Sequence, residues 1–437
     1  MSPGSVIQRP STRTEILAGI TTFLATMYII VVNPSILKDA GMPFSGVLTA
    51  TVLISAFSSI AMGLYAKNPI VLAPGMGINA FFTYSVVVGM KVPWTAALGA
   101  VFWSGVLFFV LSIFNVRTHI LKAIPLPLRL GVAGGIGLFI SFIGFKNALF
   151  IVASPATLLT RGALDPVTMT FLAGMAVTSV LLVKRIRGAL VLGIVFTTIL
   201  AIPIGRLWGD ASPFNFGVKT LVTCSGLFAW PDFSLFFSLD WFGSLKLALW
   251  PAIFSFLFTD MFDSISTFVG VAEAGNLKDP DGQPRNIKQS LIVDSLATTL
   301  SGIFGTSPAT SYIESATGIE EGGRGGLTAV TAGLLFLPFM FLYPLLSIVP
   351  AIATAPALVL VGVFMMKPAA HIAWDRFEDS IPAFLALLLI PLTFSITQGI
   401  VWGFLSWTAI RLFSGRWREV PVMLYIIDIL AIGTFFV

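Results

Sequence analysis

The chain has 437 residues, of which 56% are hydrophobic and 10% charged, and its mean hydropathy is +0.95. Soluble proteins carry about 25% charged residues, so this composition excludes a soluble globular domain. The net charge is +5, which we interpret as a membrane-topology signal and not as a nucleic-acid-binding surface. Cys224 is the single cysteine, so no intrachain disulfide is expected.

Apolar runs recur from residue 15 to the C-terminus. A helix needs about 20 apolar residues to cross a bilayer, whereas the strands of a membrane β-barrel alternate in polarity over about 10 residues. Runs such as VLISAFSSIAMGLY are solidly apolar, so we predict an all-α polytopic protein in the lipid bilayer. Its fourteen predicted membrane segments lie at residues 15–37, 46–66, 70–88, 93–115, 130–146, 166–183, 189–206, 247–272, 288–305, 309–319, 326–348, 351–366, 379–395 and 396–414. The apolar residues 421–437 either span the membrane or lie in its interface.

The distribution of basic residues supports this even count. A topology that begins in the cytoplasm and alternates places 18 of the 25 Lys and Arg residues inside and 7 outside. Membrane proteins keep Lys and Arg on the cytoplasmic side, so both termini are expected there. The N-terminal residues MSPGSVIQRPSTRTEIL lack the pattern of a cleaved signal peptide. We therefore predict a multi-pass protein of the cell (plasma or inner) membrane.

Two predicted segments are unusual. The third, NPIVLAPGMGINAFF, and the tenth, GTSPATSYIESATGI, contain Pro and Gly at membrane depth. These residues break helices, and the freed backbone groups need protein or water partners inside a bilayer. Each segment is therefore predicted as an extended stretch followed by a half-helix. Because they are the third in each set of seven, they indicate an inverted-repeat transporter with its binding site at the membrane midplane.

Five residues are candidates for that site. Asp260 and Asp263 are three positions apart in the eighth segment, where ionised carboxylates are costly and often functional. Glu314 follows the break in the tenth segment, and Asn79 lies near the matching break in the third. Each has a structural alternative: hydroxyl or backbone partners for the two aspartates, and helix capping for Glu314 and Asn79. Tyr312 is either a stacking surface for a flat ligand or an ordinary packing residue.

The inferred site contains acids and an amide but no Lys or Arg, which predicts the kind of ligand. Carboxylates accept hydrogen bonds, and Asn both donates and accepts, so a flat heterocycle with ring N–H groups fits. A carboxyl near the midplane also favours its protonated form. Asp260, Glu314 and Asp263 are therefore the candidate proton carriers, and no other cofactor is expected.

Two other functional classes are less well supported. An anion exchanger of the same architecture would need a basic residue at the site. A membrane enzyme or receptor would need a catalytic group, a metal-binding cluster or a large soluble domain, but the chain has only two histidines and no G-x-x-x-x-G-K-[ST] phosphate loop. We therefore expect a protein that is not an enzyme and has no catalytic or metal-binding residues.

The sequence resembles the nucleobase–ascorbate transporter (xanthine/uracil permease) superfamily, and within it the AzgA-like branch of adenine, guanine and hypoxanthine permeases. The stretches that carry the resemblance are TTFLATMYIIVVNPSIL, NPIVLAPGMGINAFF, FTDMFDSISTFVGVAEAGNL, SGIFGTSPATSYIESATGIEEGGRGGLTA and IPAFLALLLIPLTFSITQGIVWGF. They occur in family order along nearly the whole chain. The resemblance implies two inverted repeats of seven segments with short strands and half-helices in segments 3 and 10. It also narrows the ligand to a purine base.

The resemblance further implies a division into a core and a gate. The implied parts are a cytoplasmic tail at 1–14, core at 15–115 and 247–348, and gate at 116–246 and 349–437. Asp260 and Glu314 match the family positions that hold the base, and Asn79 and Tyr312 match its third-span polar and tenth-span aromatic positions. Asp263 replaces the small residue of many relatives. The family usually couples uptake to protons, moves its core against its gate and often forms homodimers through the gate.

Overall fold

The computed structural model describes residues 10–433 except for 115–124, 212–217, 223–225 and 280–282. Parts of several predictions lie outside these residues. They include residues 1–9 of the predicted tail, the predicted start of the gate at residue 116, Cys224, and the last residues of the 421–437 stretch.

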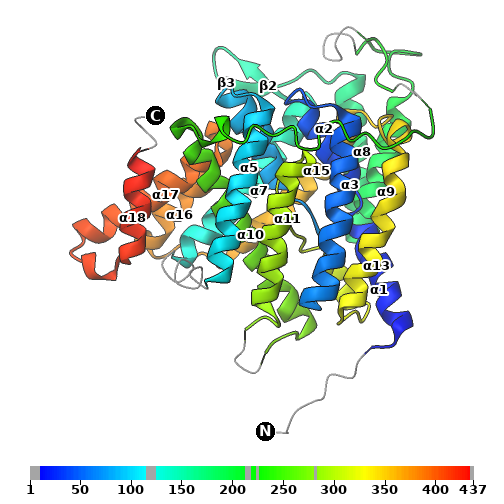
Figure 1. The fold of residues 1–437 in the computed structure, drawn as a ribbon. Coiled ribbons are helices and arrows are strands. Elements are labelled where there is room, and N and C mark those ends of the chain that lie inside the picture. Colours follow the sequence, from blue (N-terminus) through cyan, green and yellow to red (C-terminus); the bar gives the residue numbers. More distant parts are fainter. Residues whose placement is uncertain (1–9, 115–124, 212–217, 223–225, 280–282, 434–437) are drawn as a thin grey trace.

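The described chain is a bundle of helices with two very small sheets (Figure 1). The helices of the first half are α1 (Thr12–Thr26), α2 (Ile29–Lys38), α3 (Phe44–Ala61), α4 (Met76–Ala80), α5 (Trp94–Ile113), α7 (Leu126–Asn147), α8 (Pro166–Val183) and α9 (Ala189–Ala201). Those of the second half are α10 (Trp250–Gly275), α11 (Ile287–Phe304), α12 (Ser315–Glu320), α13 (Gly326–Phe336), α14 (Tyr343–Leu346), α15 (Ala351–Met366), α16 (Phe377–Thr393), α17 (Ile396–Phe413) and α18 (Val422–Gly433).

Shorter elements extend or connect these helices. Two π-helical stretches are η1 (Met62–Ala66) and η2 (Phe81–Gly89), and the 3₁₀ turns are η3 (Gly243–Leu245), η4 (Leu247–Leu249), η5 (Leu337–Phe341), η6 (Lys367–His371) and η7 (Trp417–Glu419). The strands are β1 (Leu72–Pro74), β2 (Ile151–Ser154), β3 (Leu158–Arg161) and β4 (Ala309–Ser311). β1 pairs with β4, and β2 pairs with β3, both antiparallel.

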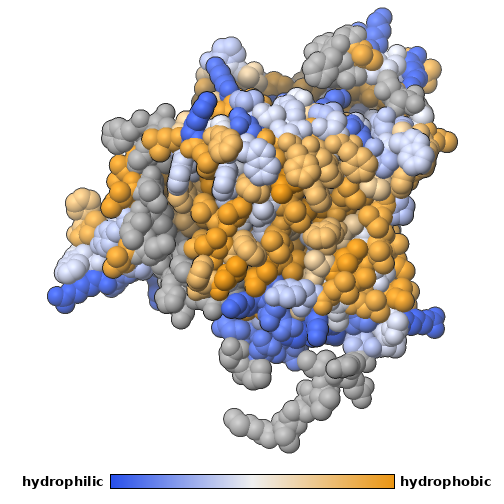
Figure 2. Space-filling view, in the orientation of Figure 1, coloured by the Kyte–Doolittle hydropathy of each residue, from blue (hydrophilic) through white to orange (hydrophobic). Residues whose placement is uncertain are grey.

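Seven helical stretches of the described residues are long and apolar enough to cross a membrane. They are Thr12–Lys38, Phe44–Ala66, Trp94–Ile113, Leu126–Asn147, Pro166–Val183, Leu247–Gly275 and Ala351–His371. Figure 2 shows an apolar band across the middle of one face of the molecule, with hydrophilic residues above and below it. These observations confirm a helical multi-pass membrane protein, whereas the count of fourteen spans and the inverted repeat stay predictions.

Most predicted segments agree closely with helices, and three differ for local reasons. The first is broken between α1 and α2 at Met27 and Tyr28. The carbonyls of these two residues accept backbone hydrogen bonds from the residues three positions later, Ile30 and Val31. The seventh ends at Ala201, two residues before Pro203, because a proline restricts the residue before it. The eleventh is interrupted at Leu337, where prolines at 338 and 344 cannot donate to the preceding turn.

The third and tenth segments are discontinuous, as predicted. Each has a three-residue strand followed by a short helix, and the two strands lie side by side with Leu72 opposite Ser311. Strand pairing continues at both ends, through bonds of 2.9 Å from Tyr312 N to Val71 O and from Gly75 N to Pro308 O. This pairing satisfies backbone groups at a depth where water is scarce.

Long-range packing joins segments that are far apart in the sequence. α5 packs on α11 and α13 packs on both α1 and α3, whereas α7 packs on α15 and α16. α7 and α15 approach closely at Gly137 and Gly362, where a Cβ on Gly137 would lie 2.7 Å from the Gly362 carbonyl oxygen. Small residues allow such close helix contacts in membranes. The division into core and gate stays a prediction.

Candidate functional site

A cluster of two acids and two tyrosines forms where α1 and α2 meet the tenth segment. The Tyr28 hydroxyl donates to Oε1 of Glu314 at 2.8 Å, and the Tyr28 and Tyr312 ring centroids are 6.4 Å apart. Asp263 of α10 lies close enough to Glu314 for the two carboxyls to interact electrostatically. The Thr310 hydroxyl of β4 donates to Oδ2 of Asp263 at 3.0 Å. The cluster therefore joins three parts of the chain that are distant in the sequence: the α1–α2 junction, α10 and the tenth segment.

The break in the tenth segment positions Glu314 and Tyr312. Glu314 immediately precedes α12, but its side chain makes no capping hydrogen bond to that helix. Its carboxylate instead meets Tyr28, so the capping alternative does not describe this residue. Tyr312 is almost fully buried, and its hydroxyl donates to the Pro74 carbonyl at 2.5 Å. That bond fixes the ring beside Tyr28 and fastens the two discontinuous segments together.

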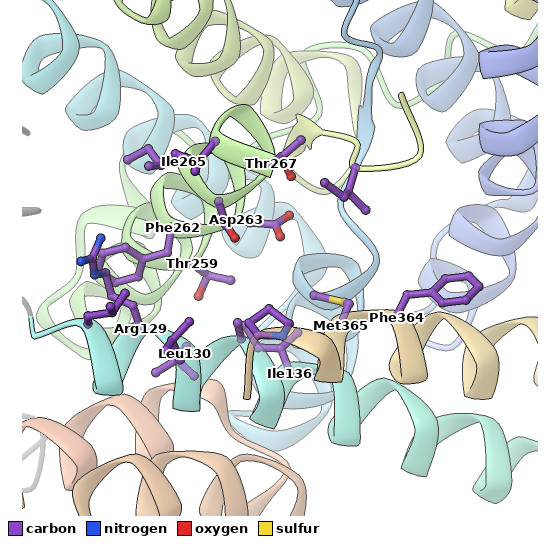
Figure 3. A pocket seen from close by; sticks show the side chains of 17 residues that line it. Arg129, Leu130, Ile136, Thr259, Phe262, Asp263, Ile265, Thr267, Phe364 and Met365 are labelled. Atoms are coloured by element: carbon purple, nitrogen blue, oxygen red, sulfur yellow. The ribbon is translucent and has the colours of Figure 1, made fainter. Parts of the chain in front are cut away.

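A cavity of about 320 Å³ lies next to this cluster. Its walls come from α7, α10, the end of α15 with η6, and Ile313 of the tenth segment. In Figure 3, Thr259 and Asp263 project from α10 on one side, and Ile136 and Met365 lie across from them. Small-molecule sites range from about 300 to 1,000 Å³, so this cavity has room for a small ligand. The lining residues are Leu126, Arg129, Leu130, Val132, Ala133, Ile136, Thr259, Phe262, Asp263, Ile265, Ser266, Thr267, Val269, Ile313, Phe364, Met365 and Pro368.

Arg129 corrects one prediction, because the site was expected to contain no Lys or Arg. This residue is in the first turn of α7 and lines the cavity on the side of Phe262 (Figure 3). From the sequence, Arg129 was interpreted only as one of the basic residues that indicate membrane topology. Its proximity to α10 depends on how α7 packs in the folded protein. The cavity therefore contains both a carboxylate and a guanidinium.

Asp260 and Asp263 do not share one environment. Residues three apart on an α-helix are offset by about 60° around its axis, and here the offset separates their contacts. Asp263 lines the cavity, whereas Asp260 is fully buried and accepts a hydrogen bond from Thr298 of α11. Asp260 is not among the residues that line the cavity.

Asn79 lies inside α4, which begins at Met76, so it does not cap that helix. It is fully buried and donates from Nδ2 to Oδ1 of Asn33 at 3.1 Å. Asn33 in turn donates to the hydroxyls of Thr51 and Thr306, each at 2.8 Å. The structure thus places Asn79 in a buried polar network between α2, α3 and the start of the tenth segment, beside and not within the lining of the cavity.

Several residues of this region were not predicted as site residues. Tyr28 contacts Glu314 across 286 positions of sequence, so no local pattern indicates it. Thr259 lines the cavity with a hydroxyl that has no hydrogen-bond partner in the described structure. Asp294 is a fully buried acid on α11 beside Asp260. A lone acid in the apolar run LIVDSLATTL is the same signal that indicated Asp260, so the sequence contained the information for Asp294.

The chemistry of the cluster favours a ligand that donates hydrogen bonds. Asp263 and Glu314 offer acceptors, Thr259 offers a hydroxyl, and the aromatic and aliphatic lining offers flat apolar contact. Among the described residues there is no group of three or more His, Cys, Asp or Glu side chains that could hold a metal ion.

Comparisons of the sequence with known proteins agree on one family, and a comparison of structures finds a shared fold. The model of the permease family Xan_ur_permease matches residues 13–402. Adenine permease AdeP of Escherichia coli (strain K12) is 42% identical over 423 residues, which cover 96% of this chain and 92% of AdeP. Guanine/hypoxanthine permease PbuO of Bacillus subtilis (strain 168) is 40% identical over 429 residues, which cover 97% of both chains. Among solved structures, the transmembrane domain of the cyanobacterial bicarbonate transporter BicA matches with a TM-score of 0.63 at 14% identity, covering 90% of this chain and 97% of that domain.

Proposed function

Because the chain belongs to the xanthine/uracil permease family, in the branch that contains adenine and guanine/hypoxanthine permeases, we propose that it imports purine nucleobases. Its substrates would be adenine, guanine, hypoxanthine or xanthine, or a subset of these. Members of this family are transporters and not enzymes, so the binding site has to recognise and release a base without changing it.

The observation that carries this proposal is the pair Asp263 and Glu314 beside the cavity. A purine presents ring N–H groups on its edges, and carboxylates accept such bonds strongly because they are charged. The Tyr28 hydroxyl holds Glu314 at 2.8 Å, and Thr310 holds Asp263 at 3.0 Å, which fixes the two acceptors before the ligand arrives. Tyr312 supplies a ring beside them.

The contacts between core and gate support alternating access by an elevator-like motion. The cavity extends between α10 and the predicted cytoplasmic ends of α7 and α15, from Thr259 to Leu126 and Pro368. Toward the predicted outer side, the Ser255 and Thr397 hydroxyls are 2.6 Å apart, and Lys146 Nζ lies 4.8 Å from the Tyr84 ring centroid. The predicted core and gate helices are thus in contact on the predicted outer side and separated by a cavity on the predicted cytoplasmic side.

We further propose proton symport, because buried carboxyls are available to carry a proton. The excess of Lys and Arg on one side of the predicted topology supports cytoplasmic termini in a plasma or inner membrane. A homodimer through the gate, which the family resemblance implies, is part of the same proposal.

The test is uptake of labelled hypoxanthine in cells that lack their own purine permeases. Excess unlabelled adenine, guanine, xanthine or uracil is added separately, with and without a protonophore. We expect saturable uptake that a subset of purines inhibits and the protonophore abolishes. Absence of uptake of every base by well-expressed protein would contradict the proposal.

Arg129 in the cavity lining favours one alternative, an anion exchanger of the same fold. We rank it second because Asp263 lines the same cavity and would repel an anion. The likeness to BicA concerns the fold alone. Transport of chloride, sulfate or bicarbonate that purines do not inhibit would support the exchanger.

A further inference from the structure

A second pair of acids lies behind the cavity, on the facing sides of α10 and α11. Asp260 and Asp294 are both fully buried. Asp294 is four residues before Thr298 on α11, so the two share a helix face, and the Thr298 hydroxyl donates to Oδ2 of Asp260. That bond brings the Asp294 face of α11 against Asp260. Asp294 and Asp260 therefore lie within range of an electrostatic interaction.

The surroundings of this pair are polar, and the charged groups of the described residues that act on Asp260 are acids. The groups that act electrostatically on Asp260 are Asp294 and Asp263, which are both acids. Ser311 donates to Oδ1 of Asp294 at 3.2 Å, and Oδ1 of Asp260 has no hydrogen-bond partner in the described structure. Two ionised carboxylates that face each other in a protein interior repel each other, and a proton on one of them removes this repulsion.

Charged groups on the elements packed against α10 lie elsewhere. α4 and α5 contain no Asp, Glu, Lys, Arg or His. The other charged side chains on packed elements are the exposed Lys288 of α11, the exposed Glu320 of α12, Arg129 and Lys146 of α7, and Arg411 of α17, which pairs with Asp379.

Strand β4 separates this pair from the cavity. Neighbouring residues of a strand point to opposite faces, and here Thr310 donates to Asp263 whereas Ser311 donates to Asp294. Thr298, the partner of Asp260, also donates to the Ala309 carbonyl of the same strand at 3.2 Å. The strand therefore contacts both acid pairs, although only Asp263 of these four acids lines the cavity.

We propose that Asp260 and Asp294 together form the proton-carrying site of the transporter, separate from Asp263 and Glu314, which bind the base. This inference rests on the proposed function of proton-coupled purine import. In each cycle one proton passes from outside water to the carboxylate pair and leaves to the cytoplasm after the base is released. β4 is the shared element through which occupation of one site affects the other.

Two transport assays on the full-length protein in proteoliposomes separate binding from coupling. Counterflow exchanges labelled for unlabelled hypoxanthine without net proton movement, whereas accumulation requires a pH gradient. For Asp294→Asn and Asp260→Asn we expect counterflow within about threefold of wild type. Accumulation driven by the pH gradient should fall to the equal concentrations that passive exchange gives.

Asp428→Asn is the matched control. Asp428 is also a buried aspartate with a threonine partner, since Thr408 donates to it at 2.5 Å, but it lies on α18. This variant should behave as wild type in both assays. Ser311→Ala is a milder second variant in case the Asp294 variant does not fold, and it should lower accumulation without a matching loss of counterflow.

Three outcomes would overturn the inference. In the first, Asp294→Asn accumulates hypoxanthine with the wild-type dependence on the pH gradient. In the second, Asp294→Asn folds but loses counterflow, which would place Asp294 in the base-binding site. Wild-type accumulation could follow a sodium gradient and not a pH gradient, which would assign another ion. A wild type that moves no purine in either assay would instead remove the proposed function, and this inference with it.

Discussion

Asp260 and Asp263 lie three residues apart on α10, but their surroundings differ in access and in partners. Asp263 lines the cavity and interacts with Glu314, whereas Asp260 is enclosed against Asp294 of α11. β4 lies between the pairs, with consecutive residues bound to each. The comparison teaches that residue type alone does not give a carboxyl its role. Access to the cavity distinguishes an acid that can contact a ligand from one whose side-chain contacts are with other protein groups.

The largest effect is expected from removing an acid on the cavity side. Glu314→Gln or Asp263→Asn replaces a charged acceptor by a neutral amide. A hydrogen bond to a charged group contributes about 1.5–3 kcal/mol, which corresponds to a roughly 10- to 150-fold loss of affinity. The measurement is the KM of hypoxanthine uptake and its displacement by competing purines.

Glu320→Gln is the matched control for charge, because Glu320 is an exposed acid at the end of α12. Its KM should stay within about twofold of wild type. An unchanged KM in both cavity-side variants would remove Asp263 and Glu314 from the binding site.

The next effect concerns the tyrosine that holds Glu314. Tyr28→Phe keeps the ring beside Tyr312 but removes the donor to Glu314. Tyr28 acts on the base only by positioning Glu314, so we expect a smaller effect than loss of Glu314: a rise of about 5- to 30-fold in the KM of hypoxanthine uptake, or about 1–2 kcal/mol. Tyr65→Phe is the control, because Tyr65 is 56% exposed. Equal KM values for the two variants would show that the hydrogen bond from Tyr28 to Glu314 does not contribute to binding of the base.

A smaller pair of effects compares the two faces of β4 directly. Thr310→Val removes the donor to Asp263, and Ser311→Ala removes the donor to Asp294. Neither hydroxyl contacts the base, and the net contribution of a typical hydrogen bond is about 1 kcal/mol, so each change should be about fivefold. Thr310→Val should raise the KM for the base, and Ser311→Ala should lower accumulation driven by a pH gradient. The same defect in both variants would mean that the two faces of β4 do not separate binding from coupling.

The discontinuous segments could be predicted because their cause is local. The Pro and Gly residues of NPIVLAPGMG and GTSPATS disfavour a continuous helix, and the strands β1 and β4 lie within these two stretches. The bounds of α8 and α15 were predicted to the residue because prolines or charged residues end both apolar runs. Such features depend on neighbours within one turn.

The separation of Asp260 from Asp263 could not be predicted in the same way. It depends on α7, α11 and α15, which reach α10 only in the folded protein. The same holds for Tyr28, which meets Glu314 from the break between α1 and α2, and for Arg129, which reaches the cavity from the start of α7. Local chemistry indicated the acids, but long-range packing decides which surface each acid faces.

The smallest effect is expected at Arg129, the cation on the cavity side. Its side chain is only partly buried, and charge interactions in such positions contribute about 0.2–1 kcal/mol. Arg129→Gln should therefore change the KM of hypoxanthine uptake by less than about sixfold and should leave accumulation intact. Arg376→Gln, at an exposed position before α16, is the control. A large loss at Arg129 alone would indicate that the guanidinium, and not the carboxylates, holds the substrate. Such a result would favour the anion exchanger, because an exchanged anion needs a cation at its site, whereas a base held by Asp263 and Glu314 does not.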